Sequence, residues 1–341
     1  MMSDGPGTPQ ASPGALSHAS PLTHHASPPP PVAYRGRFAP SPTGDLHFGS
    51  LIAAVGSYLD ARHHRGEWLI RIEDVDTTRE VRGSADRIVR ALDLFGFEWT
   101  GPIIRQSARS ERYQIILDEL IRSGQAYECS CSRAEIQASQ SSSSSSSSSN
   151  SPADELRYPG WCRQTVCNPE RDRAIRFRVP SGATCFQDTL QGEVCMDVEH
   201  DVGDFVIRRR DGLYAYQLAV VVDDADQGIT HVVRGADLLN STPRQMLLQS
   251  ALGFPHPGYA HLPVALAANG SKLSKSAGAT SLDLMHPGYE LWRALRFLKQ
   301  EPPDTLGRAS TNEVWEWAIQ HWNLDQLRGL RKQVVREADR L

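Results

Sequence analysis

Two short stretches of the chain combine residue types that suit phosphate binding. The first, residues 41–50, reads SPTGDLHFGS and carries His47 and Gly49 between a strand-like and a helix-like segment. Such a turn presents unpaired backbone N–H groups at the positive end of a helix dipole, where an anion is stabilised. The second, residues 270–276, reads GSKLSKS and offers Lys272 and Lys275 to the opposite side of the same phosphates. Together they predict that phosphates are bound and that charge on a departing pyrophosphate is stabilised, although each alone also fits an ordinary turn or a solvated loop.

The elements around these stretches must bring them together. YRGRFAP (34–40) predicts a short strand, and residues 51–66 have apolar side chains at helical spacing with Gly66 just past the end. Further strand-like and helix-like segments alternate along the chain. In the helix predicted over 110–124, Ile115, Ile116, Leu120 and Ile121 form the expected apolar side. This alternation predicts an α/β fold with a parallel sheet, interrupted by a smaller insertion.

Composition narrows the classes of protein. Residues 1–33 are rich in Pro, Ser, Gly and Ala, so we expect a disordered extension that is not a secretory signal. No apolar run approaches membrane-spanning length, and six cysteines in such a chain favour a reducing compartment, here the cytoplasm. The net charge is −4, so nucleic-acid binding would depend on local basic patches.

Several motifs, in the same order, resemble class I aminoacyl-tRNA synthetases of the glutamyl type over about residues 34–285. LHFG (46–49) corresponds to the family's HIGH motif and KLSKS (272–276) to its KMSKS motif, and similar segments are GRFAPSPTG, LIRIEDVD, YAYQLAVVVDD and ITHVVRGADLL. Ser50 replaces the second His of HIGH, and it donates a hydrogen bond but carries no charge. The resemblance implies a Rossmann-like catalytic domain that uses ATP with Mg²⁺. It implies ATP binding by His47, Gly49, Ser50 and Lys275, and catalysis by His47, Lys272 and Lys275.

The same resemblance implies a glutamate pocket. Arg37 and Arg234 would bind carboxylates, which suits a planar two-pronged guanidinium. Tyr216 would supply a hydroxyl, and Glu73 would accept from the ammonium group. The remaining implied pocket residues follow the first strand: Phe38, Ala39, Pro40 and Ser41.

Residues 277–341 are too few for the large helical region with which full glutamyl enzymes read the anticodon. The chain therefore resembles a family of shortened enzymes, the glutamyl-queuosine tRNA(Asp) synthetases. That resemblance implies activation of L-glutamate without tRNA and its transfer to the queuosine base of tRNA(Asp).

A metal site is also implied by this resemblance. The family pattern Cys-x-Cys followed by Tyr-x-x-x-Cys corresponds here to Cys129, Cys131, Tyr158 and Cys162, which would hold one structural Zn²⁺. By spacing alone, free thiols in a hairpin fit equally well. The intervening segment is longer than in the family and includes a run of serines, but doubling a loop costs only about 0.6 kcal/mol. Cys167, Cys185 and Cys195 have no motif partner, and we expect them to be structural.

These expectations divide the chain into five parts: a disordered extension (1–33), the first half of the catalytic domain (34–128), a zinc-bearing insertion (129–200) with a Ser-rich loop (139–151), the second half of the catalytic domain (201–285) and a helical tail (286–341). We expect a monomer that does not associate with membranes. Arg208, Arg209 and Arg210 could guide the tRNA backbone, or form a solvated basic face.

Three alternative functions also fit the sequence. One is an ordinary glutamyl-tRNA synthetase-like ligase, and another is a related nucleotidyltransferase that acts on a different small acid. The third is a paralogue that binds tRNA without catalysis, against which His47, Lys272 and Lys275 argue.

Overall fold

The computed structural model describes residues 33–141, 156–164, 170–267, 269–271 and 282–335, together with residues 1, 5 and 168. Lys272, Lys275, Cys167 and most of the serine run lie outside the described residues. The chain divides into two units, Met1–Val32 and Ala33–Leu341. Only residues 1 and 5 of the first unit are described, so everything below concerns the second.

A mostly parallel sheet forms the centre of this unit. Strand β1 (Arg35–Phe38) pairs in parallel with β2 (Glu67–Ile72), which pairs with β3 (Ile104–Arg105). A second group has the order β7-β6-β10-β9, and its bounds are Gly192–Met196, Thr184–Asp188, Gly258–Leu262 and His231–Gly235. The two groups lie side by side at β1 and β9, where the Thr230 N–H donates to the Arg35 carbonyl over 2.9 Å. The predicted α/β fold with a parallel sheet is confirmed.

Helix α1 (Phe48–His63) begins where the phosphate-binding turn was predicted. Leu51, Val55 and Leu59 are completely buried against the sheet. Gly56 allows the close approach of β10, because a Cβ at this position would lie 2.6 Å from a Leu262 methyl carbon. The helix is therefore fixed firmly on the sheet, and its N-terminus has a defined place.

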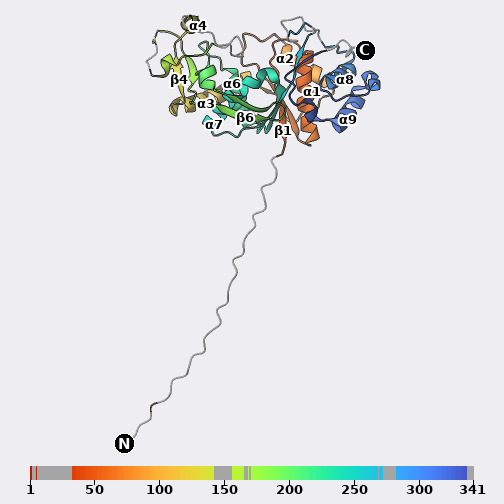
Figure 1. Ribbon diagram of the computed structural model, residues 1–341, viewed down its shortest axis with the longest axis horizontal. Coiled ribbons are helices and arrows are strands. Elements are labelled where there is room, and N and C mark those ends of the chain that lie inside the picture. The colour runs from red at the N-terminus through yellow and green to blue at the C-terminus, as the bar shows by residue number, and fades with distance from the viewer. Residues whose placement is uncertain are drawn as a thin grey trace. The chain divides into compact units, whose positions relative to one another are not determined.

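Further elements complete the unit. The other helices before residue 282 are α2 (Ser84–Leu94), α3 (Ser110–Arg122), α4 (Arg133–Ser141), α5 (Val198–Asp201), α6 (Tyr216–Asp226) and α7 (Thr242–Ala251). Short 3₁₀ helices span Gln106–Arg109, Trp161–Arg163, Ala236–Ser241, Asp304–Arg308 and Leu324–Leu327. In the view of Figure 1, α3, α6 and α7 lie on one side of β1, and α1, α8 and α9 lie on the other.

The apolar side of α3 differs from the prediction. Ile116 and Leu120 are buried as expected, but Ile115 is 54% exposed and Ile121 is 40% exposed. Tyr113 and Leu117 take their places in the core, because the buried stripe follows the three- and four-residue spacing from Tyr113.

A three-stranded antiparallel sheet consists of β4 (Ala126–Cys129), β5 (Ala174–Phe177) and β8 (Val206–Arg208). Only β5 lies wholly within residues 129–200, the segment predicted as the insertion, since β4 ends at its first residue and β8 follows it. Nearby in the sequence, β6 and β7 form an antiparallel hairpin in which Cys185 lies opposite Cys195, and the two form a disulfide. The sequence analysis found no motif partner for these cysteines and expected them to be structural, which a disulfide agrees with. The disulfide departs from the other expectation, that the cysteines of this chain stay reduced. The pairing depends on the hairpin register and not on a sequence motif.

The C-terminal part packs on α1. Helices α8 (Pro287–Phe297) and α9 (Thr311–His321) contribute to the same core, in which Trp292, Leu295 and Leu298 are buried. This part also contains a strand that was not expected, β12 (Lys332–Val334), which pairs in parallel with β11 (Val264–Leu266). None of the described helices has the length and apolar character needed to cross a membrane.

Candidate functional site

The predicted pocket residues line a single cleft of about 820 Å³. Every predicted ATP-binding and glutamate-binding residue in the described part of the chain lines it: Arg37, Phe38, Ala39, Pro40, Ser41, His47, Gly49, Ser50, Glu73, Tyr216 and Arg234. Lys272 and Lys275 lie outside the described residues. The fold thus brings these side chains to one place, while the role of each stays a prediction.

His47 caps the N-terminus of α1 at the cleft. Its Nδ1 accepts a hydrogen bond from the Ser50 N–H over 3.3 Å, so a neutral ring carries its proton on Nε2. The first turn of the helix contains no acidic side chain. Backbone N–H groups and a positive dipole end therefore meet the cleft, with no acidic side chain in the first turn of the helix itself, which suits an anion.

A buried ion-pair network holds Arg37 and Glu73. The Arg37 Nε lies 3.2 Å from Asp224, and the fully buried Arg71 reaches both Asp224, at 2.8 Å, and Glu73, at 3.3 Å. Burial alone would raise the pKa of Asp224, but Arg37 and Arg71 hold it below its usual value. Burial raises the pKa of Glu73 in spite of Arg71 and Arg37, so an ammonium group arriving there would favour its ionised form.

Sequence reasoning missed Arg71, Asp224 and also Gln106. The only sequence feature that pointed to Asp224 was the pair of acids that ends the apolar run of residues 218–224. Gln106 is completely buried at the wall of the cleft and donates to Asp223, and its Oε1 has no partner among the described residues. This unpaired oxygen is, besides Glu73, a second group at the cleft that suits an N–H donor of a ligand.

Arg234 lies on β9, which neighbours the strand that carries Arg37. It is 5% exposed; its Nη1 lies 3.5 Å from the Tyr216 hydroxyl, and its Nη2 donates to Thr242 over 2.8 Å. Burial raises the pKa of Tyr216, which keeps the hydroxyl neutral. Two guanidinium groups, one hydroxyl and one acid in a single cleft complement an amino acid with an acidic side chain.

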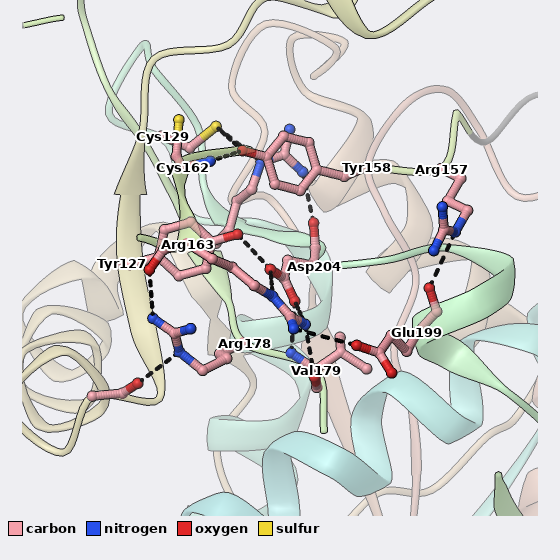
Figure 2. Close-up of polar contacts among 12 residues, drawn as sticks. Tyr127, Cys129, Arg157, Tyr158, Cys162, Arg163, Arg178, Val179, Glu199 and Asp204 are labelled. Atoms are coloured by element: carbon pink, nitrogen blue, oxygen red, sulfur yellow. Dashed lines mark hydrogen bonds and ion pairs between the residues drawn. The ribbon is translucent and has the colours of Figure 1, made fainter. Parts of the chain in front are cut away.

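The four predicted metal ligands also come together, although they come from two separate segments. The sulfur atoms of Cys129, Cys131 and Cys162 lie within 4.8 Å of one another. The Tyr158 hydroxyl lies 3.3 Å from the Cys129 sulfur and 3.6 Å from that of Cys131, and Figure 2 shows it directed toward Cys129 and Cys162.

This donor set fits zinc. A tetrahedral ion with Zn–S bonds of about 2.3 Å separates its sulfur ligands by about 3.8 Å. The Cys131 and Cys162 sulfurs are 3.4 Å apart, close to that separation. Burial raises the pKa of Cys131 to about 12, so its proton would have to be displaced by the ion.

The segment that carries Tyr158 and Cys162 is held in place by Arg163. Its Nε and Nη2 each donate to the buried Asp204 over 2.6 Å, and its Nη1 lies 3.2 Å from Glu199 (Figure 2). Asp204 also accepts from Tyr127 and from the Val179 N–H. The sequence analysis did not single out these supporting residues, because they come from segments that only the fold brings together.

The three arginines proposed to guide tRNA make contacts within the chain. Arg209 pairs with Asp76 and Asp211, and Arg210 donates to the Ser130 carbonyl. The Arg208 Nε donates to the Gly212 carbonyl. Their contact with tRNA stays a prediction.

The chain is similar to proteins of a known family. Residues 33–298 match the family described as tRNA synthetases class I (E and Q), catalytic domain. A relative from Dechloromonas aromatica, named glutamyl-Q tRNA(Asp) synthetase, is 57% identical over 292 residues, which is 86% of this chain and 95% of the relative. A protein of the same name from Ectopseudomonas mendocina is 48% identical over 307 residues, covering 90% of this chain and 98% of the relative.

A solved structure is similar as well. The crystal structure of a glutamate tRNA ligase from Elizabethkingia meningosepticum in complex with its amino acid has a TM-score of 0.73. It is 26% identical in sequence, and the match covers 90% of this chain and 68% of that one.

Proposed function

The chain belongs to the class I tRNA synthetases of the E and Q type, and on this premise we propose that it activates L-glutamate with ATP and transfers it to the queuosine base of tRNA(Asp). The observation that carries the proposal is the meeting of Arg37, Glu73, Tyr216 and Arg234 in one cleft beside the N-terminus of α1. The names of the relatives that match over nearly their whole length support the choice of acceptor.

In the first step, an α-carboxylate oxygen of glutamate attacks the α-phosphorus of ATP. An oxygen–phosphorus bond forms, the bond to the bridging oxygen breaks, and pyrophosphate leaves. His47, Gly49 and Ser50 at the start of α1 hold phosphate oxygens, and Lys275 stabilises the departing pyrophosphate. Mg²⁺ would neutralise phosphate charge when bound. No enzyme nucleophile is needed, since holding the two substrates in line supplies much of the rate enhancement.

Glutamate is recognised by charge. Arg37 and Arg234 bind its carboxylates, Glu73 accepts from its ammonium group, and Tyr216 adds a neutral hydroxyl. In the second step, a hydroxyl of the queuosine cyclopentene-diol attacks the glutamyl carbonyl carbon, an ester forms, and AMP leaves. Bases in a single-stranded anticodon loop are accessible to a cleft of this kind.

The proposal includes further expectations from the sequence. Cys129, Cys131, Tyr158 and Cys162 hold one structural Zn²⁺, the enzyme is a monomer, and the reaction takes place in the cytoplasm. The donor geometry supports the zinc ion.

Two measurements test the proposal. ATP–pyrophosphate exchange is measured with each standard amino acid in the absence of tRNA, and glutamate alone is expected to support it. Labelled glutamate is then offered to tRNA(Asp) that lacks its 3′-terminal adenosine, with or without queuosine. Labelling of the truncated tRNA only when queuosine is present supports the proposal. Labelling that needs the 3′ adenosine, or exchange that needs tRNA, would point to an ordinary glutamyl-tRNA ligase.

A further inference from the structure

Three buried polar side chains lie in a row, one from each of three adjacent strands. His261 on β10 lies opposite Arg234 on β9, and Asp188 ends β6, the strand on the other side of β10. The side chains of His261 and Asp188 are completely buried, and neither residue lines the cleft. They therefore do not touch a substrate in the cleft themselves. His261 contacts Arg234, which lines the cleft, and its Nε2 also lies 3.3 Å from the Thr242 hydroxyl that accepts from Arg234.

The hydrogen bonds define the protonation of the imidazole. His261 Nε2 lies 3.1 Å from the Nε of Arg234, and His261 Nδ1 lies 2.5 Å from Asp188 Oδ2. An arginine Nε always carries a hydrogen, so the imidazole Nε2 must accept from it. The ring proton is then on Nδ1 and is donated to Asp188. Burial lowers the pKa of His261 to about 4, in agreement with a neutral ring at neutral pH.

This arrangement orients Arg234 without neutralising it. Arg37, on the neighbouring strand, pairs directly with Asp224, whereas no carboxylate forms an ion pair with Arg234 among the described residues. The nearest negative charge along this row, on Asp188, is separated from the guanidinium by an uncharged ring. Arg234 therefore attracts an anionic ligand more strongly than it would if it were paired directly with a carboxylate, as Arg37 is.

We propose that Asp188 and His261 are positioning residues that fix the guanidinium of Arg234 for a carboxylate of the amino-acid substrate. Asp188 selects the tautomer of His261, and that tautomer holds the Nε of Arg234. The inference rests on the proposed role of Arg234 in binding glutamate.

The variant Asp188→Asn tests the tautomer. Asp188 Oδ1 accepts the backbone N–H groups of Leu190 and Gln191, at 3.0 and 2.9 Å, and an asparagine oxygen can keep both bonds. The asparagine NH₂ would then face His261 Nδ1 and force the ring proton onto Nε2, against the N–H of Arg234. We expect the KM for glutamate in pyrophosphate exchange to rise about tenfold, the scale of one lost buried hydrogen bond. The KM for ATP should stay within about twofold, since the phosphate contacts at α1 are untouched.

Imidazole ¹⁵N chemical shifts provide a readout that a purely structural role would not move. The wild-type signal of His261, assigned by its loss in His261→Gln, should report a proton on Nδ1, and Asp188→Asn should reverse this. His261→Gln keeps an acceptor near the position of Nε2 and should partly preserve the glutamate KM. His261→Leu keeps none and should match Asp188→Asn. Asp283→Asn alters an exposed Asp–His pair with His286 and should change nothing.

The outcomes separate the two proposals. If Arg234→Ala leaves the glutamate KM unchanged, the proposed role of Arg234 is wrong. If Arg234→Ala raises it but Asp188→Asn and His261→Leu do not, or if the ring keeps its proton on Nδ1 in Asp188→Asn, the positioning role is overturned and the proposed function stands.

Discussion

The guanidinium of Arg71 lies 2.8 Å from the carboxylate of Asp224, and both side chains are buried beneath the cleft. Asp224 in turn pairs with Arg37, and Arg71 also reaches Glu73. Arg71 does not line the cleft, but it contacts Glu73 directly and supports Arg37 through Asp224. Glu73 and Arg37, which carry opposite charges, do line the cleft. The proposed binding partners of a substrate ammonium group and carboxylate are thus held in place by contacts within the chain.

Replacing Arg71 should be strongly destabilising. Arg71→Met leaves Asp223, Asp224 and Glu73 without their central cation, and breaking a buried ion pair in this way costs about 3–5 kcal/mol of unfolding free energy. Urea denaturation measures the change. Arg35→Met is the matched control, because Arg35 pairs with Glu67 near the surface, with side chains 40% and 42% exposed, and should cost at most about 1 kcal/mol. Equal losses in the two variants would contradict the role given to the buried network.

Local sequence predicted those parts of the site that depend on local structure. The turn at His47 and the start of α1 follow from short-range spacing, and the resemblance then supplied Arg37, Glu73, Tyr216 and Arg234. The resemblance also supplied the four metal-ligand candidates, three of which are the cysteines that lie together in the structure.

The supporting residues could not be predicted in this way. Arg71 meets Asp224, and Asp188 meets His261, only after distant segments become neighbours in the sheet. The same holds for β12, which pairs with a strand far away in the sequence. A buried Arg or His has no distinctive local pattern, since its cost is offset by partners that only the tertiary structure provides.

Stability should depend on the titration of His261. Its pKa is about 4 in the folded chain and 6.5 in the unfolded one. Between these values the unfolded chain binds the extra proton, so the unfolding free energy should fall as the pH decreases from 6.5 to 4, by roughly 3 kcal/mol at 1.36 kcal/mol per pKa unit. The pKa of Asp188 is lowered from 3.8, so protonation of this side chain affects the unfolding free energy only at a pH below the range in which His261 titrates.

Urea unfolding at several pH values between 4.5 and 7.5 checks this expectation. His261→Gln should reduce the dependence, and what remains is expected from His231 and His256, whose pKa values burial also lowers. His286→Gln, which changes an exposed histidine, should leave the dependence as in the wild type. A slope that His261→Gln leaves unaltered would show that this residue is not the titrating group.

Loss of one sulfur ligand should remove the metal. Cys162→Ser is expected to lower the zinc content from about one ion per chain to a small fraction and to decrease Tm, since a structural zinc site needs all four ligands. Elemental analysis of the purified protein measures the content. The control replaces both Cys185 and Cys195 with Ser, which breaks the disulfide outside the cluster and should leave zinc in place. Retention of zinc by Cys162→Ser would contradict the assigned ligand set.

The serine run should be dispensable. Deletion of residues 140–149 removes polar sequence at and after the end of α4 and leaves all four proposed ligands in the chain. Loop-length changes of this size alter the free energy by well under about 1 kcal/mol, so zinc content and Tm should match the wild type. A deletion variant that loses zinc would show that the run has a structural role.

Lys275 should act on the rate of adenylation more than on substrate affinity. Its ammonium group is proposed to stabilise charge that develops on the departing pyrophosphate, an interaction that strengthens only in the transition state. Lys275→Ala should therefore lower kcat for pyrophosphate exchange by roughly two to three orders of magnitude, the scale of a lost transition-state donor, with a smaller change in the KM for glutamate. Lys332→Ala is the control, because Lys332 lies on β12 and does not line the cleft. Arg234→Ala should have the opposite effect: the KM for glutamate should rise strongly, and kcat should change less. Near wild-type exchange in Lys275→Ala would remove this residue from the mechanism and leave the N-terminus of α1 as the main support for the leaving group.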